Sequence, residues 1–458
     1  MMSNGWFEIG SPVRRAGKLV RSLLLSLAVP LTATGLAGAT QPQLAPEFVM
    51  IQEHAAPPAS VVTEMTLTLP ESLHLALQRQ PRLAVQQASL ASAEDASRAL
   101  DALKVPTLLE RELPVRRQQA TLGVTAASAG LDRVEQDTVY AVTRTWFTVL
   151  YAREQERVAR GVVDRLSATY DAAQRQLKAG ARDVTATDVN RTLVYLRLAE
   201  TRQIQAAEGV KRALVALREA IGLGREVRVD VPAGSLPEPQ ARPDQTEVVA
   251  QALARRGDLV QASTFADIIC LEVDAQATSL HKRMETFAAG ADIHSRSVPQ
   301  ELHNNEYRPG AVPPEMPTLL AGARSERMKR ARDLHARAVA AVDVTRNLIV
   351  LEAEDAFLRW EEASGEVAKA REAAETGAKL ADDLSKDFAA GLRVRVEEVV
   401  NARVLASQAR AQYNEFLYRE ILALADLERV TAGGFCAGLV GPAAARTPSA
   451  PAQGSSGK

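Results

Sequence analysis

The side chains that most often carry out chemistry are few in this sequence, and they do not converge on one place. Adjacent carboxylates occur, among them the pairs Asp382-Asp383 and Glu397-Glu398. Neighbouring positions on a helix point about 100° apart, so neither pair faces one reacting atom as an acid and a base must. We interpret them as solvated surface. The sequence also lacks a glycine-rich phosphate loop and a nucleophile elbow. It therefore predicts a protein that is not an enzyme and has no catalytic residues.

Histidines and cysteines give no stronger signal for a bound metal or cofactor. Only two cysteines occur, Cys270 and Cys436, which are too few for a disulfide framework and are not spaced as zinc ligands are. We expect no metal and no cofactor. Most of the histidines fall in or near a stretch rich in Gly, Pro and Asn, where exposed loop polar groups are the simpler interpretation. These histidines are His281, His294, His303 and His335.

The composition favours long helices over a compact enzyme. Hydrophobic residues make up 46% of the 458 residues, enough for a core, but aromatic residues only 4%. Ala, Leu, Val, Glu, Arg and Gln dominate, as in coiled coils. Lys and Arg number 55 against 56 Asp and Glu, and the two signs are interspersed. No basic face therefore indicates a nucleic-acid partner.

The N-terminus has the pattern of a cleaved export signal. Basic residues from Arg14 to Arg21 precede an apolar run from Ser22 to Val29, and Ala37-Gly38-Ala39 offers a cleavage site of small residues. We assign residues 1–39 to a signal peptide and 40–65 to a linker. No later apolar stretch reaches the roughly 18 residues that a membrane-spanning helix needs.

An internal duplication organises the rest of the chain. The tetrapeptide that starts at Pro106, Pro-Thr-Leu-Leu, recurs at Pro317, an offset of 211 residues. The same offset pairs Gly180 with Gly391 and continues without a gap to Asn190 and Asn401. Upstream, the match around Leu77 and Leu253 has an offset of 176. The second half therefore carries 35 extra residues, which form an inserted loop.

These matches set the domain boundaries. Each half opens with a helix, continues through a short irregular segment into a very long helix, turns at Gly180 or Gly391, and returns on another helix. Between the halves we expect a linker with at most one short strand, around Val227 to Pro232. The first repeat spans 66–233, the second spans 234–434 with the inserted loop at about 287–316, and a disordered tail spans 435–458.

Heptad spacing predicts that the two long helices of each half form an antiparallel coiled-coil hairpin. The predicted fold is mainly α: duplicated hairpins whose mostly small seam residues allow close helix approach, and which form an α-barrel on oligomerisation. The seam of the first arm in the second half is Ala363, Val367, Ala370, Ala374, Gly377, Ala381, Leu384 and Phe388. The seam of the returning arm is Val400, Val404, Ser407, Ala411, Asn414, Tyr418, Ile421 and Ala425.

Several segments, in this order and in duplicate, resemble the TolC-like outer-membrane efflux proteins. They are the helix start from Leu67 to Leu77, the run Ala152-Arg153-Glu154-Gln155, the turns from Lys178 to Val189 and from Phe388 to Val399, and the helix end from Leu217 to Leu223. The likeness covers about residues 66 to 433. No single motif is diagnostic; the specificity lies in their order and duplication.

The resemblance implies a homotrimer that forms the exit duct of a tripartite efflux or type I secretion system. Such a duct sits in the cell outer membrane, has a large periplasmic part, and works with a periplasmic adaptor (membrane fusion) protein and an inner-membrane pump. In the family the hairpin tips meet the adaptor. The corresponding residues here are Gly180, Val184, Thr187, Asp188, Gly391, Leu392, Val396 and Glu397.

One part of the chain departs from the family. The family places a β-hairpin in each half for the outer membrane, whereas the first half has only Lys104 to Gly123 there, a stretch rich in charged residues. We therefore expect short or degenerate β-hairpin segments. The alternative is a periplasmic coiled-coil structural or interaction protein without a channel. A closed trimer with a polar lumen would distinguish the duct from this alternative.

Overall fold

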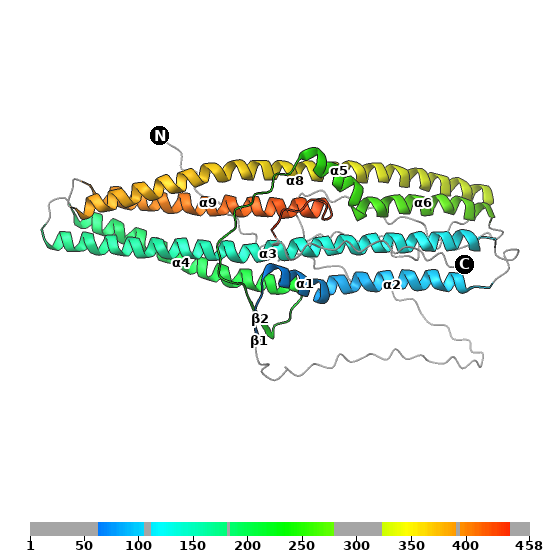
Figure 1. Ribbon diagram of the computed structural model, residues 1–458, viewed down its shortest axis with the longest axis horizontal. Coiled ribbons are helices and arrows are strands. Elements are labelled where there is room, and N and C mark those ends of the chain that lie inside the picture. The colour runs from blue at the N-terminus through cyan, green and yellow to red at the C-terminus, as the bar shows by residue number, and fades with distance from the viewer. Residues whose placement is uncertain (1–62, 105–110, 181–183, 279–322, 391–393, 440–458) are drawn as a thin grey trace, which may run out of the picture. The chain divides into compact units, whose positions relative to one another are not determined.

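The helices of this chain come in two sets that repeat in length and order (Figure 1). The computed structural model describes residues 63–104, 111–180, 184–278, 323–390 and 394–439. The first set is α1 (Leu69–Arg79), α2 (Pro81–Ala102), α3 (Leu113–Lys178) and α4 (Ala186–Ile221); the second is α5 (Gln245–Arg255), α6 (Gly257–Thr278), α8 (Arg324–Ala389) and α9 (Val396–Val430). Their lengths are 11, 22, 66 and 36 residues in the first set and 11, 22, 66 and 35 in the second. The predicted fold class, mainly α with duplicated long hairpins, is confirmed.

Side chains fix the start of each set, as the sequence predicts. Before α1, the backbone N–H of Thr68 donates to Oε2 of Glu71 at 2.8 Å, and Pro70 lies in the first turn. Before α5, the side chain of Asp244 accepts from the backbone N–H of Glu247 at 3.0 Å. Capping residues of this kind typically contribute about 1 kcal/mol. These local bonds determine where each repeat begins.

The hairpin of α8 and α9 has a seam of small side chains. All the predicted seam positions on α8 are buried except Leu384, which is half-buried. A Cβ atom at Gly377 would lie 3.3 Å from the Cα atom of Ala406 on α9, so the two backbones approach closely there. Small side chains allow this approach, although they bury less apolar area per turn than leucines do. The predicted seam of α8 is confirmed.

The predicted seam of the returning helix α9 is wrong by one or two residues over its middle part. Two of its predicted members contact α3 instead of α8. The carbonyl of Ala411 accepts from Gln155 of α3 at 3.1 Å, and the ring of Tyr418 stacks on that of Tyr151 with centroids 4.6 Å apart. Because α9 packs against two helices, its apolar residues form two adjoining stripes, and spacing alone does not assign each stripe to a partner. The row buried along the middle of α9 is Ala402, Ala406, Ala409, Tyr413 and Leu417.

Helix α6 joins the two repeats, since it packs against both α3 and α8. Arg116 on α3 and Arg327 on α8 occupy equivalent positions at the offset of 211, and both reach α6. Arg116 forms a buried ion pair with Glu272, and Nε of Arg327 donates to Gln276 at 2.7 Å. Gln276 in turn donates to Glu272 at 2.6 Å. Buried charges are stable only when they are paired and hydrogen-bonded, so this cluster fixes α6 between the two long helices.

A second buried cluster of charges joins the start of α6 to the second hairpin. Glu352 on α8 pairs with Arg429 on α9 at 2.8 Å and with Arg256, which also binds Asp258 at 2.5 Å. Burial alone would raise the pKa of Glu352, but the charges of Arg429 and Arg256 outweigh burial and lower it. Asp258 also pairs with Arg133 of α3 at 3.3 Å. The cluster therefore links both hairpins.

The strands of the described residues form one parallel pair. β1 (Thr63–Thr66) and β2 (Val227–Asp230) pair residue for residue. β2 is the short strand that the sequence predicts between the halves, whereas β1 lies at the end of the expected linker 40–65 and was not predicted. A parallel partner so distant in sequence leaves no local signal. Just after β1, the carbonyl of Leu67 accepts from Nε1 of Trp146 at 3.1 Å, which anchors the pair to α3.

The long helix α3 begins inside the stretch from Lys104 to Gly123, where a degenerate hairpin was expected. The chain is helical from Leu113, and Pro114 occupies the first turn, where its missing N–H is tolerated. Arg116 pairs with Glu112 at 2.9 Å. The charged residues that suit a strand poorly thus stabilise a helix start. Among the described helices, none has a stretch long and apolar enough to cross a membrane.

Some predicted segments lie outside the described residues. They are the signal peptide 1–39, the inserted loop 287–316 and residues 440–458 of the predicted tail. Residues 435–439 of that tail differ from expectation, because they pack against the helices. Ala437 is buried, and its backbone N–H donates to Glu428 at 2.6 Å. The ordered part of the second repeat therefore continues past Gly433.

Candidate functional site

The predicted site lies where the hairpins turn, and the first turn requires glycine. α3 ends at Lys178, and Gly180 follows with φ of +75°. This left-handed conformation costs a residue with a side chain roughly 1–2 kcal/mol. The N–H of Gly180 donates to the carbonyl of Leu177 at 3.1 Å, which satisfies one of the free carbonyls of the helix end. No atom lies within 4 Å of where a Cβ would be. Conformation, and not crowding, therefore selects glycine.

Thr185 and Asp188 fix the start of α4 as a capping box. The N–H of Asp188 donates to Oγ1 of Thr185 at 3.2 Å, and the N–H of Thr185 donates to Oδ2 of Asp188 at 3.0 Å. Hydrogen bonds from Thr185, followed by the charges of Arg191 and Arg395, lower the pKa of Asp188. Thr187 lies between the capping residues and is exposed. The first tip thus presents a fixed carboxylate.

The second turn is organised differently, although it belongs to the same duplication. α9 begins at Val396 after Arg395, without a side-chain cap. The exposed Glu397 supplies negative charge in the first turn, where the helix dipole is positive. Gly391 and Leu392, which the sequence also assigns to this tip, lie outside the described residues. The two tips therefore differ in chemistry.

Two of the predicted contact residues are buried. Val184 and Val396 are 5% and 3% exposed, and they share an apolar cluster with Leu166, Phe388 and Val399. The cluster takes members from both hairpins, so it holds the two turns together. These valine side chains therefore pack inside the tips and support them, while Thr187 and Glu397 remain exposed at the surface.

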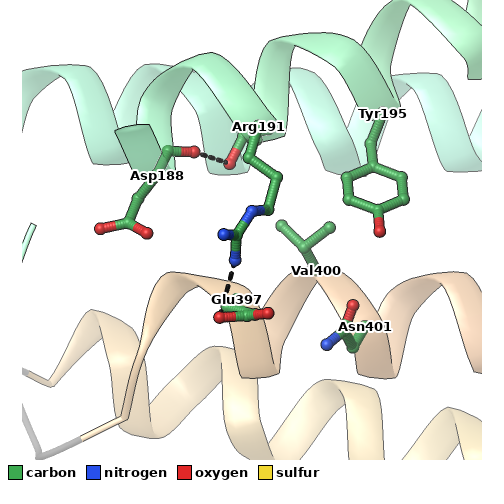
Figure 2. Close-up of a pocket in the computed structure, with 7 residues that line it drawn as sticks. Asp188, Arg191, Tyr195, Glu397, Val400 and Asn401 are labelled. Carbon is green, nitrogen blue, oxygen red and sulfur yellow. Dashed lines mark hydrogen bonds and ion pairs between the residues drawn. The ribbon is translucent and has the colours of Figure 1, made fainter. Parts of the chain in front are cut away.

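An ion pair joins the two hairpins just behind the turns. Figure 2 shows Arg191 of α4 reaching toward Glu397 of α9, and the distance from Nη1 to Oε2 is 2.7 Å. Tyr195 and Asn401 line the space beside the pair, about 10 Å³, which is close to the least that one water needs. Both charged side chains are nearly half exposed, so the pair contributes at most about 1 kcal/mol to stability. Its main effect is to fix the position of α4 relative to α9 near the tips.

Sequence reasoning missed three residues of this group: Arg191, Tyr195 and Asn401. The sequence holds a partial signal for two of them. Arg191 follows Asp188 by three positions, so both lie on one helix face, and Asn401 is the copy of Asn190 at the offset of 211. The sequence does not say that α4 and α9 lie side by side at the tips. That contact is tertiary, and no heptad pattern within either hairpin specifies it.

The other side chains that the sequence singles out do not gather into one site within the described residues. The four carboxylates of the pairs Asp382-Asp383 and Glu397-Glu398 are exposed, as predicted. In the described part of the chain, no cluster of His, Cys, Asp and Glu side chains has the arrangement of a metal site. Cys270 and Cys436 are both exposed and form no disulfide.

No protein-family model and no curated protein matches this chain. Solved structures do match. The open state of the MtrE outer membrane channel of Neisseria gonorrhoeae superposes with a TM-score of 0.63 at 14% identity, over 80% of this chain and 89% of that one. The outer membrane protein VceC from Vibrio cholerae gives 0.61 at 14% identity, over 80% and 96%. The CmeC outer membrane channel of Campylobacter jejuni gives 0.60 at 12% identity, over 81% and 89%.

At these identities the likeness concerns the fold. The chain has the fold of outer-membrane channels, and the TolC-like architecture that the sequence predicts is confirmed in that sense.

Proposed function

We propose that the chain is one subunit of a passive exit duct in the outer membrane, with a large periplasmic part. The duct would serve a tripartite efflux or type I secretion system. The observation that carries this proposal is the matched pair of 66-residue helices, α3 and α8, in a fold shared with outer-membrane channels. Each helix is roughly 100 Å long at about 1.5 Å per residue. Long rods of this kind suit the wall of a tube made from several copies.

The duplication supports assembly with further copies of the chain. Phe147 on α3 and Leu358 on α8 are equivalent at the offset of 211. Phe147 is 1% exposed, in a cluster that includes residues of α9, whereas Leu358 is 54% exposed. Tyr140 and Leu351 form a second equivalent pair: Arg429 of the second repeat lies over the Tyr140 ring, and Leu351 is 47% exposed. A second copy would cover α8 as the second repeat covers α3.

This equivalence also gives the direction of assembly. Within the chain α3 packs against α9 and α6 of the second repeat. The same contact between copies sets α8 against α4 and α2 of the next copy. Each added copy repeats the contact in one direction, so the assembly closes into a ring where the rotation fits. With the likeness to TolC-like proteins, we take the ring to be a homotrimer.

Cross-linking between copies tests this arrangement. Thr148 and Tyr418 are joined within the chain by a hydrogen bond of 2.7 Å between their hydroxyl groups. Their equivalents at the interface between copies are Arg359 and Ala207. The double variant Arg359→Cys/Ala207→Cys, treated with a short bis-maleimide, should give a ladder of products that ends at three chains. Only uncross-linked chain, or products that extend beyond three, would contradict a closed trimer.

The controls use the same helices. The native Cys270 and Cys436, both exposed, are first replaced by Ser. The pair Arg359→Cys/Glu208→Cys then moves one cysteine a single residue along α4, so that it points about 100° away. This pair should cross-link poorly. Equal products from both pairs would mean random collision and not a defined interface.

We further propose that the tips bind a periplasmic adaptor, a membrane fusion protein that couples the duct to an inner-membrane pump. The fixed carboxylate of Asp188 and the exposed Glu397 support a charged contact. A photo-reactive residue at Thr187 should capture the adaptor, identified by mass spectrometry, whereas one at the exposed Thr201 on the same helix should not. The proposed contact residues are Gly180, Thr187, Asp188, Gly391, Leu392 and Glu397.

Membrane fractionation separates the duct from a periplasmic coiled-coil protein without a channel. A trimer extracted by detergent from the outer membrane supports the duct. A soluble periplasmic monomer or dimer would overturn the duct and favour the interaction protein. The exposed stripe on α8, which includes Leu351 and Leu358, would then contact another partner.

A further inference from the structure

A polar cavity of about 320 Å³ lies where the two repeats meet. Its walls come from α3, α8, α9 and residues 235–238, which lie between β2 and α5. Glu154 marks its position on α3, roughly 35 Å along the helix from the tip. The volume falls at the lower end of the range for small-molecule sites, about 300–1,000 Å³. Neither the tips nor the proposed interface between copies uses this cavity.

One buried group on the cavity wall has no hydrogen-bond partner. Asn414 of α9 is 2% exposed, and its Nδ2 makes no hydrogen bond within the part of the chain that the structure describes. An amide nitrogen carries two N–H donors, and buried polar groups in proteins nearly always have a partner. Because Asn414 lines the cavity, an acceptor group of a molecule bound there can supply the missing hydrogen-bond partner.

Of the two guanidinium groups at the cavity, one is already neutralised. Arg371 pairs with Glu238 at 2.8 Å, and the same carboxylate accepts from the hydroxyl of Tyr413 at 2.8 Å. Arg410 lies over the Tyr413 ring, 5.1 Å from its centroid, and forms no ion pair with any described residue. Arg410 therefore remains available to an anion, next along α9 to the free amide of Asn414.

Carboxylates from the other helices line the same cavity. Glu154 of α3 is 5% exposed and pairs with Arg157 at 2.7 Å, while Glu375 of α8 is exposed. Free donors thus come from α9, and carboxylates come from α3 and α8. A molecule that satisfies both sets carries an anionic and a cationic group close together.

We propose that this cavity binds a small zwitterion of amino-acid size. Its carboxylate accepts hydrogen bonds from Asn414 Nδ2 and from Arg410. Its ammonium group donates to Glu375, which pairs with no described residue, and to Oε2 of Glu154, whose Oε1 already accepts from Arg157. The binding site draws on both repeats, so the occupied chain is more stable than the empty one. This inference does not depend on the duct proposal, because it concerns a cavity within a single chain.

Calorimetric titration of the purified full chain tests the proposal. The probes are glycine, L-alanine and L-glutamine, with acetate and methylammonium as fragments that carry only one of the two charges. At least one amino acid should bind at millimolar concentration or below with one site per chain, and both fragments should bind at least about tenfold more weakly. No amino acid binding, or acetate binding as tightly as L-alanine, would overturn the proposal.

Variants separate binding from folding. Asn414→Leu removes the free donor at nearly constant volume, so the melting temperature should stay the same or rise while amino-acid affinity falls at least about tenfold. Gln412→Leu, at an exposed position two residues away on α9, should bind as the unaltered chain does. If Asn414→Leu does not fold, Arg410→Met at the exposed rim of the cavity tests the same site, because it should also lower the affinity for the amino acid. Unchanged affinity in the folded variant would overturn the site.

Discussion

At the residue scale, the contribution of an ion pair to stability depends on how deeply the pair is buried. Glu352 is buried between Arg429 and Arg256, whereas Arg191 and Glu397 meet at the surface. Removing one partner of a buried pair leaves the other charge uncompensated, which costs about 3–5 kcal/mol. The same change at an exposed pair costs at most about 1 kcal/mol. The first kind of pair therefore bears on stability and the second on local geometry.

Glu352→Gln should lower the free energy of unfolding at pH 7 by about 3 kcal/mol. The pKa of Glu352 lies below its ordinary value of 4.5, so its ionised form stabilises the fold above about pH 4.5. That stabilisation is lost as the pH falls through the lowered pKa. The difference between the two proteins in denaturant titrations should therefore shrink in acid. A difference that stays constant down to about pH 3 would mean that Glu352 does not act through its charge.

Arg191→Glu should loosen the tips without unfolding the chain. It sets two carboxylates against each other between α4 and α9, while the change in stability stays within about 1 kcal/mol. Spin labels at Thr187 and Glu398 should report a broader distance distribution in this variant by pulsed electron paramagnetic resonance. The exchanged pair Arg191→Glu/Glu397→Arg should restore the narrow distribution. If the exchange restores nothing, the ion pair does not hold the tips.

At the scale of elements, the hairpin depends on the close approach of α8 and α9. Gly377→Leu should lower the free energy of unfolding by about 2 kcal/mol, because the new side chain meets the backbone of Ala406. Gly365→Leu on the same helix is the matched control, since nothing lies within 4 Å of its Cβ position. It should be neutral or stabilising by up to about 1 kcal/mol, from helix propensity. Equal effects of the two changes in thermal denaturation would contradict a tight seam at Gly377.

Elements that are specified by a local sequence pattern could be predicted. Elements that depend on contact with a segment far away in the sequence could not. Capping residues, the glycine turn and the α8 heptads are local, so the sequence predicts the ends of most helices and one seam. The α9 seam was misplaced because α9 serves two neighbours. β1 was missed because its partner is β2. In the site, Val184 and Val396 were taken for contact residues, since burial by the opposite hairpin leaves no mark in either turn.

At the scale of the whole molecule, the exposed stripe on α8 is the feature to test. Leu358→Glu should reduce the trimer, measured as mass in detergent, while leaving the helical content of the chain unchanged, because it charges a surface that we expect another copy to cover. Leu405→Glu on α9 is the control. Leu405 and its equivalent Val194 are both exposed, so neither repeat covers this position in the other. Loss of the trimer in both variants would point to a general effect of charge.

The parallel strand pair has a consequence for the order in which the chain folds. Glu64 on β1 and its partner Arg228 on β2 are 164 residues apart, with all of α1 to α4 between them. The entropy cost of closing so long a loop grows only slowly with its length, but the closing segment has to be present. β1 therefore stays unpaired until β2 has been synthesised. During that interval its open edge can pair with the wrong strand. Chains that end before Val227 should accumulate as misassembled species, whereas chains that extend past Asp230 can close the first repeat on themselves.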